Sequence, residues 1–301
     1  MIGKHIWAVG GGKGGIGKSL ICANLGLSLS RMGKRVILMD ADLGGSNLHV
    51  LLGLRSTKYA LNDFLELKIP LSEVMQDVGV NGLKLISGAS AVLGLANPHY
   101  TQKLKIISEM LRLDADYILL DLGAGTSYNV LDFFAVADQG LVVICPEPSS
   151  IQGGYGFIKT ALFRQLTRYF AKDIQVCKLL QELGRPKSVR RLQAMSDLIT
   201  ELGRIDPQIQ EEFRQRLSMF RPKLIINMLS QQQEQESVLA VKVVAEKYLG
   251  IKVDFVGCLY EDMLVKKSAK KMSPLLVSNP DCSSAQEINN IVSRLIALEE
   301  T

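Results

Sequence analysis

The chain has 301 residues, and its 47% apolar and 22% charged residues, with 9 prolines against 26 glycines, exclude a disordered or collagen-like protein. Its apolar runs are broken before the ~18 residues that a membrane-spanning helix needs, and the opening run is too short for a signal peptide, so we expect a cytoplasmic protein. The net charge of +5 comes from residues 164–223, which contain 13 Lys and Arg residues and 7 Asp and Glu residues.

Short apolar runs rich in β-branched residues alternate with segments of helical periodicity along the chain. The runs predict strands at residues 5–9, 36–39, 83–86, 117–120, 141–145, 224–228 and 253–259. Because parallel strands are joined by helices, this alternation predicts an α/β fold with a mostly parallel, doubly wound sheet. Ligands of such sheets bind at the carboxyl ends of the strands, so the candidate site residues are sought there.

Residues 169–219 interrupt this alternation, because they hold helical segments and turns but no buried strand. We therefore predict a single domain, residues 1–301, in which residues 169–219 form a helical insertion. The arginines of the insertion suit a surface that docks an acidic protein, a phosphate backbone or a lipid headgroup, and the alternative is a solvated face on a helical lid. These arginines are Arg185, Arg190, Arg191, Arg214 and Arg216.

A glycine-rich segment follows the first predicted strand. Residues 12–19 match the phosphate-binding P-loop pattern G-x-x-x-x-G-K-[ST] at every fixed position, between a strand and a helix. In that motif backbone N–H groups surround phosphate oxygens, Lys18 neutralises the β and γ phosphates, and the Ser19 hydroxyl binds Mg²⁺. A glycine-rich turn that binds nothing is the alternative. The predicted nucleotide-binding residues in this segment are Gly12, Lys13, Gly14, Gly15, Ile16, Gly17, Lys18, Ser19 and Leu20.

Two further predicted strands end in carboxylates. Asp40 and Asp42 follow the second strand, and their spacing lets both face a metal–phosphate cluster while one orients an attacking water. Asp121 ends an apolar strand and looks like the magnesium-holding acid of a Walker B element. For residues 40–47, a turn that is merely rich in Asp and Gly is the alternative.

The second lysine of the P-loop, Lys13, makes the loop resemble the deviant P-loop of the MinD/ParA family of dimerising ATPases. The resemblance implies a P-loop NTPase fold, binding of ATP, ADP and Mg²⁺, and hydrolysis of ATP to ADP and phosphate. It also implies an ATP-dependent homodimer in which Lys13 reaches the partner's nucleotide. Lys13, Lys18 and Asp42 are then the predicted catalytic residues.

The same resemblance distributes roles among the carboxylates. Asp42 corresponds to the water-positioning aspartate of the first switch, and Asp40 lies near the Mg²⁺ shell. Ser19, Asp40 and Asp121 are the predicted magnesium-site residues. Family members commonly have proline where this chain has Gly123, in the second switch.

Later segments extend the resemblance, which covers residues 3–165 and 222–298. Asn227 stands where the family places the amide that reads adenine, and residues 257–262 resemble a base-contacting loop. A plain strand terminator is the alternative for Asn227. Residues 145–151 resemble the corresponding segment of the flagellar-number branch, FlhG (also called FleN), and a rigid turn that caps a helix is the alternative there.

The resemblance predicts a switch that positions or counts a cellular machine such as the flagellum or the division site. We expect a protein partner or activator, and contact with the inner membrane surface or a cell pole. MinD itself ends in a basic amphipathic membrane helix. Here residues 288–298 are predicted to pack on the core, and the acidic residues that follow disfavour anionic lipid.

Two other functions use a deviant P-loop and stay open. An ATP-dependent metallocofactor carrier holds its cluster with paired cysteines, and the five cysteines here include no C-x-x-C pair, so no metal cluster is expected. A nucleoid-binding partition ATPase would use the basic segment as a nonspecific DNA footprint. Iron content and salt-sensitive binding to random duplex DNA distinguish these alternatives.

Overall fold

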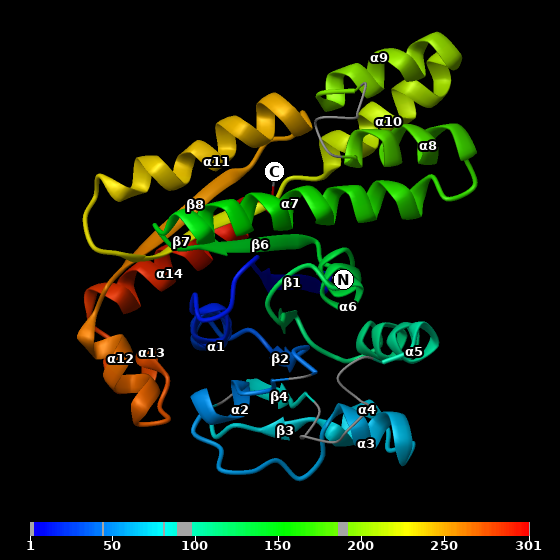
Figure 1. The fold of residues 1–301 in the computed structure, drawn as a ribbon. Helices are drawn as coiled ribbons and strands as arrows, with labels where there is room; N and C mark the ends of the chain where they lie inside the picture. Colours follow the sequence, from blue (N-terminus) through cyan, green and yellow to red (C-terminus); the bar gives the residue numbers. More distant parts are fainter. Residues whose placement is uncertain (1–2, 44, 81, 89–97, 186–191, 301) are drawn as a thin grey trace.

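The protein folds as one eight-stranded sheet with helices on both faces (Figure 1). The computed structural model describes residues 3–43, 45–80, 82–88, 98–185 and 192–300. The strands lie in the order β3-β4-β2-β5-β1-β6-β7-β8, and neighbouring strands are parallel except for β3 and β4. They are β1 (His5–Gly10), β2 (Val36–Asp40), β3 (Gln76–Asp77), β4 (Leu83–Ile86), β5 (Tyr117–Asp121), β6 (Gln139–Ile144), β7 (Lys223–Leu229) and β8 (Asp254–Tyr260).

The predicted α/β class with a mostly parallel, doubly wound sheet is confirmed, and each predicted strand is present. The edge strand β3 was not predicted. Its two residues, Gln76 and Asp77, are polar and pair only with β4, so no apolar run marks them.

Two separate cores flank the sheet because side chains alternate along each strand. In β1, Trp7 and Val9 join the core under α1 and α14, whereas Ile6 and Ala8 join the core under α5, α6, α7 and α11. The helices are α1 (Lys18–Arg31), α2 (Leu48–Leu51), α3 (Leu61–Glu66), α4 (Leu71–Val74), α5 (Tyr100–Met110), α6 (Tyr128–Phe134), α7 (Pro148–Tyr169), α8 (Ile174–Gly184), α9 (Met195–Ile205), α10 (Pro207–Met219), α11 (Glu234–Leu249), α12 (Met263–Lys270), α13 (Leu275–Ser278) and α14 (Ser283–Ala297).

Three helices, α8, α9 and α10, lie between α7 and β7, and Figure 1 shows them grouped at the C-terminal end of α7. Their buried side chains, including Leu180, Leu198 and Phe213, belong to the same core as one face of the sheet. Aspartates accept hydrogen bonds from the first-turn N–H groups of α8 and α10 and so fix where these helices begin. Arg190 and Arg191 lie outside the described residues.

The last helix, α14, buries the apolar stripe that includes Ile288, Ile291 and Leu295, as predicted for a core-packing helix. Beyond it, the nearly buried Glu299 carboxylate accepts hydrogen bonds from Trp7 Nε1 at 2.5 Å and Tyr117 Oη at 3.1 Å. These bonds tie the end of the described chain to β1 and β5. Within the described residues, none of the helices combines the length and the apolar character needed to cross a membrane.

Candidate functional site

The predicted phosphate site lies at the carboxyl ends of three adjacent strands, β2, β5 and β1 (Figure 1). The P-loop follows β1, Asp40 ends β2, and Asp121 ends β5. Backbone hydrogen bonds join the three ends, because Ala41 N donates to the Asp121 carbonyl at 2.9 Å and Leu122 N donates to the Val9 carbonyl at 3.0 Å. The sheet therefore brings together segments that are about 80 to 110 residues apart in sequence, as expected for an α/β site.

Two glycines give the P-loop its shape. Gly17 has φ +86°, a left-handed conformation that other residues adopt only with strain, and it sits immediately before α1. Gly12 packs directly against the backbone of Gly153 in α7, so a Cβ at position 12 would collide with that helix. The loop is therefore fixed both to α1, whose N-terminal N–H groups favour an anion, and to α7.

Lys18 is the first residue of α1 and is 7% exposed. Its ammonium donates to the Lys13 carbonyl oxygen at 3.2 Å, so the side chain folds back over the loop. Burial lowers the pKa of Lys18, while the nearby carboxylates of Asp121 and Asp42 act against this shift. The structure thus places the Lys18 ammonium close to two carboxylates. A bound phosphate would add a further negative charge next to this ammonium.

Asp40 holds the first-switch segment through three hydrogen bonds. Its carboxylate accepts from Ser46 Oγ at 2.7 Å, from Leu48 N at 3.1 Å and from Asp42 N at 3.1 Å. Burial raises the pKa of Asp40 despite these hydrogen bonds. Sequence reasoning placed this acid near Mg²⁺ and missed its role in shaping the loop, which depends on Ser46.

The Asp42 carboxylate lies against the second-switch backbone. A Cβ built on Gly123 would stand 3.1 Å from Asp42 Cγ and Oδ1, and one built on Gly45 would stand 3.4 Å from Asp42 Oδ2. Gly123, at the position where the MinD/ParA family commonly has proline, therefore leaves room for Asp42 to pack close to the backbone. Gly125 N also donates to the Gly11 carbonyl at 3.2 Å, which connects this segment to the P-loop.

Asp121 is 2% exposed, and its Oδ1 is buried without a hydrogen-bond partner among the described residues. Burial and the neighbouring Asp40 raise the pKa of Asp121 to about 8, although the Ser19 hydroxyl and Lys18 act in the opposite direction. A buried, unpartnered carboxylate oxygen next to a serine hydroxyl is the kind of hard oxygen donor set that Mg²⁺ takes with phosphate ligands. The residues present therefore fit a magnesium ion.

Lys13 is held within its own chain by the segment that follows β6. Its ammonium contacts Glu147 Oε2 at 2.5 Å and Ser149 Oγ at 2.9 Å, and the Lys13 and Glu147 side chains are both substantially exposed. Sequence reasoning singled out residues 145–151 but did not pair them with this lysine. Their only signal in the sequence is a glutamate and a serine at the start of α7.

Asn227 ends up beside the P-loop, where it closes one side of a small pocket. Its Nδ2 donates to the Ile16 carbonyl at 2.8 Å and also lies against Gly17. The pocket, about 60 Å³, opens between the start of α1 and the segment after β8. It is lined by Gly17, Leu20, Asn227, Met228, Leu259, Tyr260, Glu261, Asp262, Val265, Lys266, Ser284 and Ile288. The structure thus brings Asn227 and the end of the 257–262 segment together.

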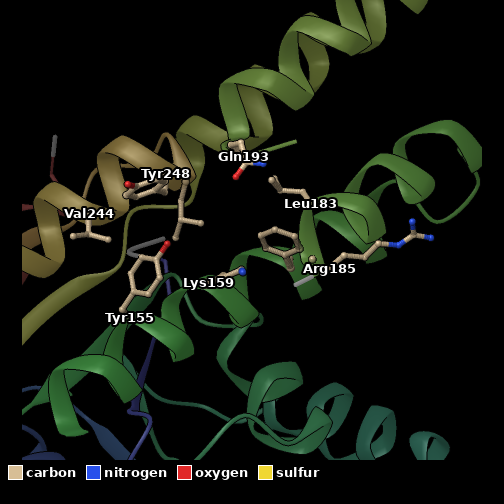
Figure 2. Close-up of a pocket in the computed structure, with 10 residues that line it drawn as sticks. Tyr155, Lys159, Leu183, Arg185, Gln193, Val244 and Tyr248 are labelled. Carbon is tan, nitrogen blue, oxygen red and sulfur yellow. The ribbon is translucent and has the colours of Figure 1, made fainter. Parts of the chain in front are cut away.

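A larger cavity of about 440 Å³ lies away from the P-loop, between α7, α8 and α11 (Figure 2). Tyr155 and Lys159 of α7 point into it from one side, and Tyr248 of α11 faces them. Arg185, one of the insertion arginines, lines its edge and forms an ion pair with Glu182 at 2.8 Å. Arg216 instead stacks on the Tyr169 ring at 3.7 Å, so these two arginines have different partners.

Comparisons with known proteins identify related sequences. Residues 3–161 match the ParA family model, whose description is NUBPL iron-transfer P-loop NTPase. Over 157 residues the chain is 37% identical to antiactivator FleN of Pseudomonas aeruginosa, a match that covers 52% of this chain and 55% of FleN. Over 162 residues it is 34% identical to flagellum site-determining protein YlxH of Helicobacter pylori, which covers 50% of this chain and 52% of YlxH. The match thus spans about half the length of these curated relatives.

Solved structures show the same fold over nearly the whole chain. The septum site-determining protein MinD of Pyrococcus horikoshii, solved with Mg-ADP, superposes with a TM-score of 0.66 at 17% sequence identity. The superposition covers 99% of this chain and 98% of that protein. The likeness in fold therefore extends over nearly the whole of both chains.

Proposed function

This chain belongs to the ParA family of P-loop NTPases, and we propose that it is a MgATP-dependent ATPase switch that dimerises with ATP and separates after hydrolysis. The observation that carries the proposal is the convergence of Lys18, Ser19, Asp42 and Asp121 at one edge of the sheet, where the Asp121 carboxylate accepts a hydrogen bond from Ser19 and keeps one buried oxygen without a partner among the described residues. The Mg-ADP bound to the similarly folded Pyrococcus horikoshii MinD supports the choice of nucleotide.

In this proposal the P-loop binds the phosphates, and Asn227 and Leu20 border the site of the base. The backbone N–H groups of residues 12–19 surround the phosphate oxygens, and Lys18 pairs with the β and γ phosphates. Asn227 and Leu20 border the pocket that takes the adenine ring. Because Asn227 is bonded to the Ile16 carbonyl, it also fixes the loop on which the phosphates rest.

Ser19 and Asp121 would hold the magnesium ion, with Asp40 close behind them. A bound Mg²⁺ supplies positive charge against the phosphate oxygens. Asp42, packed beside Gly123, orients the attacking water as general base or hydrogen-bond acceptor. Lys18 stabilises the charge that develops on the transferred phosphoryl group.

Lys13 supplies the link between nucleotide and assembly. In one chain it is paired with Glu147 and Ser149, and both Lys13 and Glu147 are exposed, so the lysine can exchange these partners for a phosphate of the second subunit's nucleotide. An exposed ion pair contributes only about 0–1 kcal/mol, so its loss is readily offset by a triphosphate contact. This exchange supports ATP-dependent dimerisation.

The cellular role that the relatives support is control of the number or position of flagella, or of the division site. YlxH is named for the flagellar site and MinD for the septum site, and FleN is an antiactivator. We infer that this chain acts through a protein partner and works at the inner membrane surface or a pole as a peripheral protein.

Nucleotide titration of two P-loop variants tests the proposal. Lys18→Ala is expected to weaken MgATP binding by about 30-fold or more, because truncating one partner of a buried charge pair costs about 2–5 kcal/mol. Ser19→Ala is expected to lose the dependence of binding on Mg²⁺. Lys172→Ala, at an exposed site outside the P-loop, is the matched control. Unchanged MgATP affinity in Lys18→Ala would falsify the phosphate-site assignment.

The matching family model is named for iron transfer, which favours a second candidate function, an ATP-dependent metal-cluster carrier. Among the described residues, no group of three or more His, Cys, Asp and Glu side chains is placed to hold a metal ion. Iron analysis of anaerobically purified protein separates the two functions, because a carrier copurifies with near-stoichiometric iron and a spatial switch does not.

A further inference from the structure

A buried carboxylate on α6 gathers three cations from two other helices. Asp132 accepts from Lys103 of α5 at 2.5 Å, from Arg164 of α7 at 2.9 Å and 3.3 Å, and from Arg168 of α7 at 3.2 Å. One negative charge thus meets three positive charges. The cluster is a structural tie between α5, α6 and α7 that leaves an excess of two positive charges.

The excess charge reaches the surface through the arginines. The Asp132 and Lys103 side chains are 1% and 5% exposed, whereas Arg164 and Arg168 are 25% and 36% exposed. None of the 22 residues of α7 is Asp or Glu, and in α5 the glutamate, Glu109, pairs with Arg112. The outer face of the cluster is therefore positive, with no acid on these helices left to balance it.

Two exposed tyrosines lie near Arg164. Tyr128, the first residue of α6, is 69% exposed, and its ring lies 4.6 Å from the Arg164 guanidinium. Tyr100, the first residue of α5, is 54% exposed and lies within electrostatic range of Arg164. Tyrosine and arginine are the residues that protein interfaces favour at their energetic centres. Large, rigid, exposed rings beside guanidinium groups that share a single carboxylate are poorly explained by packing inside the monomer.

We propose that Tyr100, Tyr128, Arg164 and Arg168 form a docking surface for an acidic protein segment. Arginine pairs with carboxylates through two parallel hydrogen bonds, and the tyrosine rings supply apolar area with a polar rim. A protein segment fits better than duplex DNA because only two guanidinium groups are offered, where a nonspecific DNA footprint engages a longer row of phosphates. We call these four residues the tyrosine–arginine surface.

The tyrosine–arginine surface is joined to the second switch by a short piece of backbone. Ser127 caps α6 by accepting from Val130 N, and Tyr128 follows it directly. Three residues earlier in the chain than Tyr128, Gly125 N donates to the P-loop carbonyl of Gly11. A partner bound to Tyr128 therefore restrains the start of α6 and the switch beside the nucleotide. This link rests on the proposed function, whereas the surface itself does not.

Binding of a labelled polyglutamate peptide of about 20 residues, measured by fluorescence anisotropy without nucleotide, tests the surface alone. The wild type is expected to bind with salt-dependent affinity, and Tyr128→Ala and Arg168→Glu each weaken binding about tenfold or more, the loss expected at an interface centre. Two controls are expected to keep the wild-type affinity. Ile174→Ala removes an equally exposed side chain on α8, and Arg112→Glu reverses a charge just beyond the C-terminal end of α5.

Two results would overturn the docking surface, and a third would refute its link to the switch. Equal affinities in wild type, Tyr128→Ala and Arg168→Glu place the acidic segment elsewhere. Tighter binding of a 30-base-pair duplex, lost in the same two variants, makes the surface a nucleic-acid site. If the bound peptide does not slow hydrogen exchange at residues 123–127, the link to the switch is refuted. This measurement needs no nucleotide, so its outcome is separate from a failure of MgATP binding.

Discussion

Replacing Asp132 with asparagine tests how much the buried charge cluster stabilises the fold. The substitution keeps the shape of the side chain but removes the single anion shared by Lys103, Arg164 and Arg168. Lys103 is then left as a buried cation without an ionised partner, whereas the two arginines can turn to water. Breaking a buried ion pair in this way costs roughly 3–5 kcal/mol, a large share of the 5–15 kcal/mol that stabilises a typical domain.

Urea denaturation followed by the Trp7 fluorescence measures this loss, since Trp7 is the one tryptophan of the chain and is fully buried. Asp114→Asn is the control, because Asp114 pairs with Arg35 at 2.6 Å but its side chain is 84% exposed. An exposed pair of this kind contributes about 0–1 kcal/mol. The reasoning fails if Asp132→Asn costs no more than Asp114→Asn. A second test uses Asp132→Leu, which also removes the anion. The reasoning fails if adding Lys103→Met to Asp132→Leu recovers none of the unfolding free energy that Asp132→Leu loses.

The pH dependence of the same variant has a definite sign. Although burial opposes ionisation, the hydrogen bonds from Arg164 and Lys103 hold the pKa of Asp132 below its ordinary value. The folded-state pKa is then lower than the unfolded value of about 3.9, so the stabilisation is complete above that value and is lost as the pH falls below it. The difference in unfolding free energy between wild type and Asp132→Asn is therefore expected to shrink from pH 6 to pH 3.

Three further changes test the nucleotide site. Asp42→Ala is expected to bind MgATP but to hydrolyse it far more slowly, so that ATP-bound dimer accumulates in light scattering; wild-type turnover moves the water-positioning role to Asp40. Gly123→Ala places a Cβ 3.1 Å from the Asp42 carboxylate and is expected to lower kcat with little change in ATP affinity, and the reverse pattern contradicts the contact. Asn227→Ala removes the hydrogen bond to the Ile16 carbonyl and is expected to weaken ATP binding about tenfold, since such a bond is worth about 1 kcal/mol and the contact with the base adds to it. An unchanged dissociation constant for ATP refutes that role of Asn227.

Much of the geometry of the candidate site could be predicted from the sequence because its determinants are local. The P-loop pattern combines a strand, glycines and a helix start within 15 residues, and Asp40 and Asp121 are the terminal residues of their strands. The periodicity of apolar residues likewise defines strands that are buried on both faces, which is why the seven longer strands were recognised and the two-residue β3 was not.

The contacts between distant segments could not be predicted, since they depend on how helices settle on the sheet. Lys13 meets Glu147 across 134 residues of chain, and Gly12 fits against Gly153 only because α7 crosses the loop there. The Asp132 cluster draws its cations from two other helices, and no spacing in the sequence marks it. Such tertiary pairs add partners that the sequence does not show, as for Lys13, which is bonded within its own subunit.

The most direct test of the central claim is the molar mass in solution with each nucleotide. Size-exclusion chromatography with light scattering should give one chain of 33.1 kDa with MgADP and two chains with MgATP in the slowly hydrolysing Asp42→Ala variant. Adding Lys13→Ala to that variant should return the mass to one chain with MgATP, because the contact to the partner's nucleotide is gone. A mass that is the same with MgATP and MgADP, or a dimer that persists without Lys13, contradicts the ATP-dependent switch.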